Sequence, residues 1–161
     1  MTIAVGDRLP DANFLVMTEE GPATVALAEK LKGRKVVIFA VPGAFSTTCH
    51  VAHMPSFIRT KDGFAEKGVD EIICLAVNDP FVMKMWGEAS GAQEAGITCL
   101  SDADGSYAKS IGQSFDAEIV GFYGRSLRYA MYVEDGVVKV FHPETSRGCE
   151  ISSGEALLAE I

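Results

Sequence analysis

The chain has 161 residues, of which 48% are hydrophobic and 22% charged, and its formal net charge is −8. This size and composition predict one globular domain, residues 1–161, with a full hydrophobic core. An acidic chain binds phosphates poorly, which argues against nucleic acid as a partner. No apolar run reaches the roughly 18 residues of a membrane-spanning helix, and the first residues do not resemble a signal peptide. We therefore expect no membrane association and a cytoplasmic location.

The first predicted element is a buried strand at residues 36–41, Val-Val-Ile-Phe-Ala-Val. Such a continuous apolar run is typical of a strand that is covered on both faces. Pro42 and the glycine after it end the strand. A helix is expected next, capped within residues 46–48, bent near Pro55 and stopped by Gly68.

A second buried strand is predicted at residues 71–77, and a helix from Pro80 to about Ala89 follows it. Asp79 is the expected N-cap of that helix, because a short polar side chain before a proline suits a helix start. A short strand at 98–100 and a short helix near 107–111 come next.

Two β runs, residues 127–133 and 137–141, flank Asp135-Gly136, which is a hairpin signal. A last helix is predicted at 153–161. Strands separated by helices predict a parallel sheet with right-handed crossovers, and the hairpin adds antiparallel strands. The expected fold is α/β and thioredoxin-like, with a central mixed β-sheet flanked by helices.

The segment that follows the first buried strand is the candidate site. Ligand chemistry in α/β sheets gathers at the carboxyl ends of strands. Cys49 falls in the first turn of the next helix, where partial positive charge and free N–H groups favour the nucleophilic thiolate. The Ser46 hydroxyl is expected near the sulfur, and Pro42 is expected to exclude water. From position alone, Cys49 fits a buried structural cysteine equally well.

Three segments carry a resemblance to a known family. The pattern Pro42-x-x-x-Ser46-x-x-Cys49 resembles the active-site motif of peroxiredoxins. Residues 41–45 and 77–86 are similar to the type II, or peroxiredoxin 5, group, and residues 124–129 resemble the segment that supplies the family's active-site arginine. The resemblance covers nearly the whole chain in one order.

The resemblance implies a thiol-specific peroxidase that reduces hydrogen peroxide and organic hydroperoxides to water and alcohols through a sulfenic acid on Cys49. It implies that Pro42 shields the cysteine, Ser46 hydrogen-bonds it, and Arg128 holds the thiolate and polarises the peroxide. Most relatives carry Thr where Ser46 stands. Arg125 is the alternative arginine; we prefer Arg128 because the predicted strand would fix its side chain, whereas Arg125 lies in the preceding turn.

The thiol that restores Cys49 is left open. The chain has four cysteines, none in a Cys-x-x-Cys pair, and Cys99 is expected in the core. Cys74 and Cys149 are the candidate resolving cysteines by resemblance, but a buried strand position such as Cys74 would reach Cys49 only by local unfolding. We expect a one-cysteine cycle with glutathione and glutaredoxin as reductant. The alternative is an intramolecular disulfide that is reduced by thioredoxin.

Three further residues are predicted near the site: Phe45, His53 and Trp86. Cys49 and His53 share a helix face, but too few other ligands are available for a metal site, so no metal and no cofactor is expected. At this spacing the imidazole is not expected to point at the sulfur, and His53 is expected to line the pocket or an interface. The resemblance further implies a homodimer.

A different class of function uses the same cysteine. A thioredoxin-fold redox sensor or binding module would pass the oxidation of Cys49 to a partner protein. Retention of Pro42, Ser46 and Arg128 favours catalytic turnover over signalling.

Overall fold

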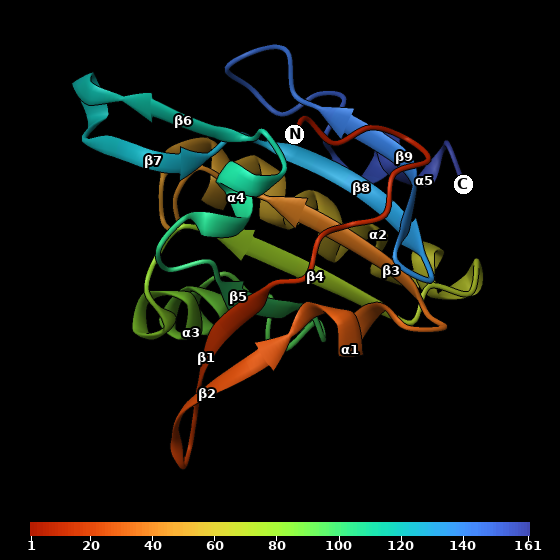
Figure 1. Cartoon of the computed structure of the whole chain (residues 1–161), viewed down its shortest axis with the longest axis horizontal. Coiled ribbons are helices and arrows are strands. Elements are labelled where there is room, and N and C mark those ends of the chain that lie inside the picture. The colour runs from red at the N-terminus through yellow and green to blue at the C-terminus, as the bar shows by residue number, and fades with distance from the viewer.

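The computed structural model describes every residue from 1 to 161, and Figure 1 shows a central twisted sheet with helices packed on both faces. The sheet has seven strands in the order β2-β1-β5-β4-β3-β8-β9, and a separate hairpin pairs β6 with β7. The strands are β1 (Asn13–Thr18), β2 (Gly21–Ala26), β3 (Lys35–Ala40), β4 (Glu71–Ala76), β5 (Thr98–Ser101), β6 (Ser114–Ala117), β7 (Phe122–Ser126), β8 (Tyr129–Glu134) and β9 (Val137–Pro143). The helices are α1 (Leu27–Leu31), α2 (Met54–Glu66), α3 (Pro80–Ala89), α4 (Ser106–Ser110) and α5 (Gly154–Leu158).

The centre of the sheet is parallel, as the sequence predicts. β3 pairs in parallel with β4, and β4 with β5, while β8 runs antiparallel to β3 and β9 antiparallel to β8. Every β3 residue from Val36 to Ala40 is buried, which explains why that segment reads as a continuous apolar run. The thioredoxin-like fold with a mixed sheet is thereby confirmed.

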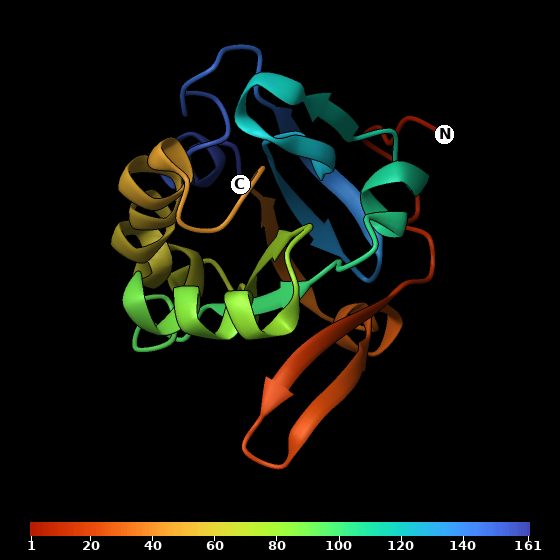
Figure 2. The same ribbon diagram turned by 90° about the vertical axis from the view of Figure 1, so that its left-hand side faces the viewer.

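Alternation along the strands divides the core into two layers. On one face, α2, α3 and α5 pack on the sheet through Phe57, Trp86 and Leu157, and Cys49 lies in this layer. On the other face, α1 and α4 contribute Leu27 and Tyr107. Figure 2 views the molecule from the side on which β3 and β4 end, and it shows α2 and α3 together on one side of the sheet.

The helix that carries the candidate cysteine begins irregularly. Residues Cys49–His53 form one π-helical turn before α2 continues from Met54. Pro55 stands at the start of α2 and has no N–H to give to the preceding turn, which favours such a local widening. Gly68, with φ +85°, follows the helix as predicted. Asp79 caps α3 by accepting a hydrogen bond of 3.0 Å from the N–H of Val82.

Sequence patterns missed both exposed hairpins. β1 and β2 form one that projects from the body in Figures 1 and 2, and β6 and β7 form the other. β2 and β7 alternate mainly between exposed and half-buried residues and include Pro22 and Gly124, so neither has the apolar run of a core strand. β1 does carry an apolar run at residues 14–17, with Phe14 fully buried in the core, but this strand was not predicted. The predicted strand at 127–133 begins later than expected, at Tyr129, and the last helix spans only Gly154–Leu158. None of the helices combines the length and the apolar character that a membrane-spanning segment requires.

Candidate active site

Cys49 lies in the π-helical turn beyond the carboxyl end of β3, and its side chain is buried. The helix starts immediately after Ser46, whose carbonyl accepts a hydrogen bond of 2.9 Å from the N–H of His50. The sulfur therefore sits in the first turn, where backbone N–H groups have no helical partner. This is the placement that the sequence predicts for a reactive cysteine.

Arg128 contacts the sulfur directly. Its Nη2 donates to Cys49 Sγ over 3.3 Å, and its Nη1 lies 3.0 Å from Nδ1 of His53. The arginine is only 9% exposed, so water competes weakly for either contact. A buried cation beside the sulfur stabilises negative charge there. The side chain reaches the site from the junction before β8, because that strand begins at Tyr129.

Arg125 occupies a different place. Its Nη1 donates to the carbonyl of Pro42 over 3.1 Å, and its guanidinium lies 4.8 Å from the centre of the Phe122 ring. The reason that we gave for preferring Arg128 is therefore wrong: Arg125 belongs to the strand β7, whereas Arg128 precedes a strand. Arg125 instead secures the loop that carries Pro42. Gly43 allows this close packing, since a Cβ there would lie 3.0 Å from Arg125 Nη1.

The loop between β3 and Cys49 is tightly folded. The hydroxyl of Ser46 donates to the carbonyl of Gly43 over 2.6 Å, so its proton is directed to the loop and not to the sulfur. Phe45 has a φ of +65°, a conformation that is unfavourable for a bulky residue, and its side chain is 51% exposed. Its ring stacks on His50 with 5.9 Å between centroids. Phe45 therefore stands at the outer rim of the site.

His53 is buried behind Arg128. Its Nε2 lies 2.8 Å from the carbonyl oxygen of Ser152, and its Nδ1 faces Arg128. Burial, reinforced by the charge of Arg128, lowers the pKa of His53 to about 3, so the ring is neutral at physiological pH. The sequence placed His53 near the pocket without identifying either partner. Ser152 and Glu144, which organise the loop around it, were missed, because they lie far along the chain and match no motif.

The side chain of Trp86 is fully buried and has no surface exposed to solvent. Its indole Nε1 donates to Nδ1 of His50 over 2.9 Å. Trp86, which the sequence predicts near the site, belongs to the same core layer as Cys49. Trp86 supports His50, which in turn supports the Phe45 ring.

The other cysteines lie at different depths. Cys74 is fully buried in β4, directly beside Cys99 on β5, and burial together with that neighbour raises the pKa of its thiol well above the usual value. Cys149 is half-buried in the loop after β9, where burial raises the pKa of its thiol. Ser152 Oγ lies 3.9 Å from Cys149 Sγ. All four cysteines are free thiols.

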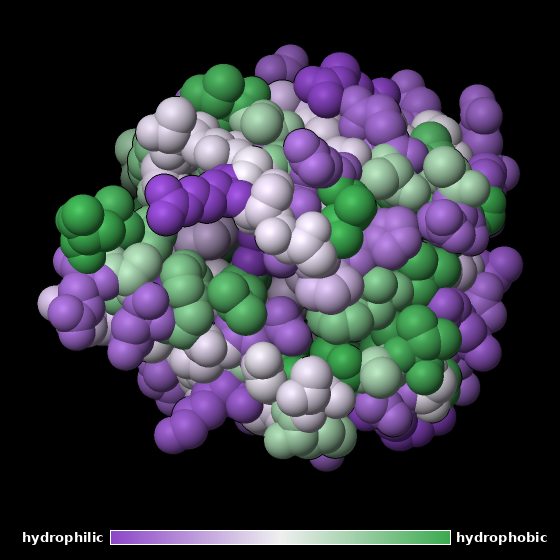
Figure 3. Space-filling model, turned by 90° about the horizontal axis from the view of Figure 1, so that it is seen from above, coloured by the Kyte–Doolittle hydropathy of each residue, from purple (hydrophilic) through white to green (hydrophobic).

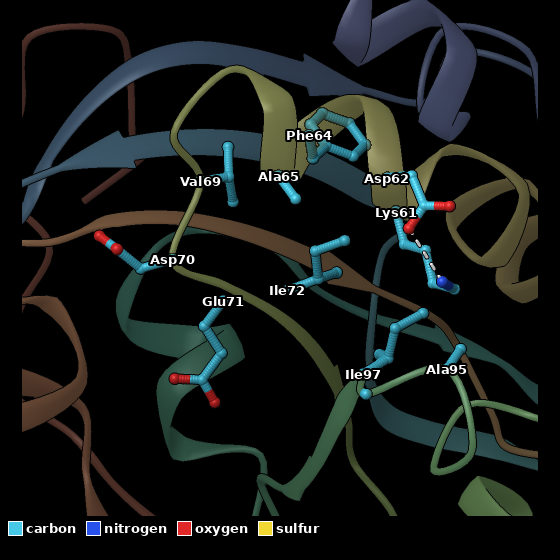
Figure 4. A pocket seen from close by; sticks show the side chains of 11 residues that line it. Lys61, Asp62, Phe64, Ala65, Val69, Asp70, Glu71, Ile72, Ala95 and Ile97 are labelled. Atoms are coloured by element: carbon cyan, nitrogen blue, oxygen red, sulfur yellow. Dashed lines mark hydrogen bonds and ion pairs between the residues drawn. The ribbon is translucent and has the colours of Figure 1, made fainter.

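Four surface cavities lie away from the cysteine, and Cys49 lines none of them. The cavity in Figure 4, of about 190 Å³, is bordered by Lys61, Phe64 and Glu71, at the far end of α2 and the start of β4. Glu71 is already paired there with Lys30 and Arg34, each over 2.9 Å. No group of three or more His, Cys, Asp or Glu side chains is arranged to hold a metal ion.

Known proteins resemble this chain over almost its whole length. Residues 4–158 match the family model for redoxin. Peroxiredoxin-2E-2, chloroplastic, of rice is 43% identical over 99% of the chain and 73% of the relative, and peroxiredoxin-2B of Arabidopsis thaliana is 38% identical over 99% and 98%. The crystal structure of reduced Prx3 from Vibrio vulnificus in complex with hydrogen peroxide is 44% identical, with a TM-score of 0.91 over 99% of both chains. The chain therefore belongs to the redoxin family and is a peroxiredoxin, a thiol-dependent peroxidase.

Proposed function

We propose that Cys49 is the peroxidatic cysteine and that the enzyme reduces hydrogen peroxide and organic hydroperoxides to water and alcohols. One observation carries this assignment: Cys49 is buried in the first turn of a helix, and the Arg128 guanidinium donates to its sulfur over 3.3 Å. The relative from Vibrio vulnificus is described as a complex with hydrogen peroxide, which supports the substrate class.

The chemistry follows from where charge develops. The Cys49 thiolate attacks the terminal oxygen of the hydroperoxide, the sulfur–oxygen bond forms and the oxygen–oxygen bond breaks. The departing alkoxide or hydroxide takes a proton from solvent and leaves as alcohol or water, and Cys49 becomes a sulfenic acid. Arg128 and the backbone N–H groups of the helix start are placed to stabilise the developing negative charge, an effect often worth several kcal/mol. Pro42, in the loop between β3 and the cysteine, is assigned the role of shielding the sulfur from water by the resemblance to peroxiredoxins.

Recycling uses an external thiol in this proposal. Glutathione attacks the sulfenic sulfur, water leaves, and the mixed disulfide is reduced by a second thiol through glutaredoxin. The burial of Cys74 inside the sheet supports this cycle, because a rigid strand cannot carry its thiol toward Cys49. An intramolecular disulfide from Cys74 or Cys149, reduced by thioredoxin, is the alternative.

A homodimer and a reducing compartment such as the cytoplasm complete the proposal. Large apolar side chains are exposed at the start of α3, where Phe81 is 66% exposed, and on the β6–β7 hairpin, where Tyr123 is 64% and Ile119 is 97% exposed. Figure 3 shows apolar atoms projecting at the left edge, over the tip of that hairpin. Four free thiols suit a reducing compartment. Light scattering should give a mass near twice 17.2 kDa, and a mass of one chain would contradict the dimer.

The central test compares peroxide consumption by the wild type, Cys49→Ser and Cys99→Ser. Each protein is assayed with glutathione plus glutaredoxin and, separately, with thioredoxin. We expect Cys49→Ser to abolish turnover and Cys99→Ser, a matched loss of one thiol, to retain it. Unchanged turnover in Cys49→Ser would refute the assignment, and turnover with thioredoxin alone would identify the alternative reductant.

A further inference from the structure

A closed ring of hydrogen bonds joins the backbone of Arg128 to its own guanidinium. The carbonyl of Arg128 accepts from the N–H of Glu144 over 2.9 Å. The Glu144 carboxylate accepts from the hydroxyl of Ser152 over 2.8 Å, and the carbonyl of Ser152 lies 2.8 Å from His53 Nε2. His53 Nδ1 closes the ring 3.0 Å from Arg128 Nη1.

Glu144 is the centre of the loop that follows β9. Its Oε1 accepts from the backbone N–H of Glu150 over 2.6 Å and of Ser152 over 3.3 Å, and its Oε2 accepts from the N–H of Thr145 over 3.2 Å. These bonds lower the pKa of the Glu144 carboxyl despite the opposing effect of its partial burial. One ionised side chain thus fixes the backbone conformation of the loop as far as Ser152.

The ring fixes the tautomer of His53. A carbonyl only accepts, so the nitrogen that faces Ser152 carries the proton, and a guanidinium only donates, so the nitrogen that faces Arg128 offers its lone pair. The opposite tautomer would point an N–H at the guanidinium and a lone pair at the carbonyl. The position of the Ser152 carbonyl therefore decides whether His53 can hold Arg128 on the sulfur.

We propose that Glu144 is a positioning residue of the peroxidase: through Ser152 and His53 it holds the Arg128 guanidinium against Cys49. The proposal rests on the function assigned to Cys49. Glu144 touches neither the sulfur nor the peroxide site and acts only through the ring.

The first test is Glu144→Gln, which keeps the shape of the side chain and removes its charge. We expect peroxide to oxidise Cys49 about tenfold more slowly in a single turnover, the scale of losing one hydrogen bond to a charged group. Glu144→Asp should recover part of the rate. Glu150→Gln is the matched control, because it removes the same charge from the same loop and its exposed carboxylate makes no hydrogen bond. Equal rates for Glu144→Gln and Glu150→Gln would overturn the proposal.

A second measurement separates positioning from general loosening of the fold. Nitrogen-15 NMR of the His53 ring should show the Nε2–H tautomer in the wild type and a mixture of tautomers in Glu144→Gln. An unchanged tautomer in the variant would overturn the proposal even if the rate fell.

A double-mutant cycle then tests the pathway. Glu144→Gln and His53→Asn should slow oxidation together by little more than His53→Asn alone, since both act through one ring. If the double variant slowed oxidation by the product of the two separate factors, Glu144 and His53 would act independently and the proposed pathway would be refuted. These outcomes differ from failure of the proposed function, in which Cys49→Ser would retain peroxidase turnover.

Discussion

Nη2 of Arg128 lies 3.3 Å from Sγ of Cys49, while Nη1 of the same guanidinium lies 3.0 Å from Nδ1 of His53. Cys49 and His53 lie in one helical turn, 79 and 75 positions from Arg128 in the sequence, and each contacts one of the two terminal nitrogens of the guanidinium. The planar guanidinium can satisfy both at once, and the compact ammonium of lysine cannot. The geometry therefore depends on the shape of the arginine as well as on its charge.

Arg128→Lys should slow the oxidation of Cys49 by peroxide roughly tenfold to a hundredfold, although the positive charge is retained. Stopped-flow fluorescence of Trp86, the single tryptophan, offers a way to follow the reaction. Arg125→Lys is the comparison, because Arg125 contacts the Pro42 carbonyl and the Phe122 ring and not the sulfur. If Arg125→Lys were the slower variant, the assignment of the two arginines would have to be exchanged.

Stability at mildly acidic pH should depend on His53. The pKa of His53 is about 3 in the folded protein against an ordinary value of 6.5, so the unfolded chain binds more protons between these values. Stability is therefore full above about pH 6.5 and is lost as the pH falls toward 3. At about pH 5 the loss is roughly 2 kcal/mol, from 1.36 kcal/mol per pKa unit.

Urea unfolding of the wild type and His53→Asn between about pH 7 and pH 5 measures this loss. The variant should be less stable at neutral pH, because its contacts with Arg128 and Ser152 are altered, but its stability should change less with pH. The Glu71 carboxyl, whose pKa is lowered, lies outside this hydrogen-bond network, so its contribution is equal in both proteins and cancels in the comparison. If the free energy of unfolding fell equally with pH in the wild type and in His53→Asn, the fold would not be keeping the His53 imidazole neutral.

Local signals in the sequence predicted the elements that carry the site, but not the contacts that complete it. The apolar segment of β3 and the N-cap at Asp79 each depend on a few neighbouring residues, so both can be predicted from the sequence alone. Arg128 and His53 are separated by 75 positions, and Ser152 and His53 by 99, so only the fold brings them together. A neutral histidine between a carbonyl and a guanidinium has no sequence pattern.

The exposed hairpins escaped prediction for a different reason. Residues of β1 and β2 pair with each other at the sheet margin, where one face stays open to water and polar residues are tolerated. The backbone conformation of Phe45 is likewise not predictable from the sequence. Its positive φ is imposed by the loop that closes on Cys49, and nothing in the residue type favours it.

Removal of the Cys74 thiol should leave most of the peroxidase activity. Cys74→Ser should retain at least about half of the rate supported by glutaredoxin, because the thiol is enclosed between strands and a buried, rigid position cannot approach Cys49 without local unfolding. The serine hydroxyl in this apolar site should cost roughly 1–3 kcal/mol of stability. Cys74→Ala, which adds no polar group, separates that cost from any effect on turnover, and near-total loss of activity in both variants would identify Cys74 as a resolving thiol.

Gly154 marks the point where α5 meets α2, and a side chain there should be poorly tolerated. A Cβ at this position would overlap the carbonyl oxygen of Ser56 and the hydroxyl of Thr60, and the N–H of Gly154 donates to Ser56 Oγ over 2.9 Å. Because the first obstacle is backbone, the helices must separate, and Gly154→Ala should lower the free energy of unfolding by roughly 1–3 kcal/mol. Gly148→Ala is the control, since the nearest atom to its new methyl group would be Ser146 Oγ at 3.6 Å. Denaturant unfolding of the two variants should differ by most of that amount, and equal midpoints would show that α5 can shift away from α2 without loss.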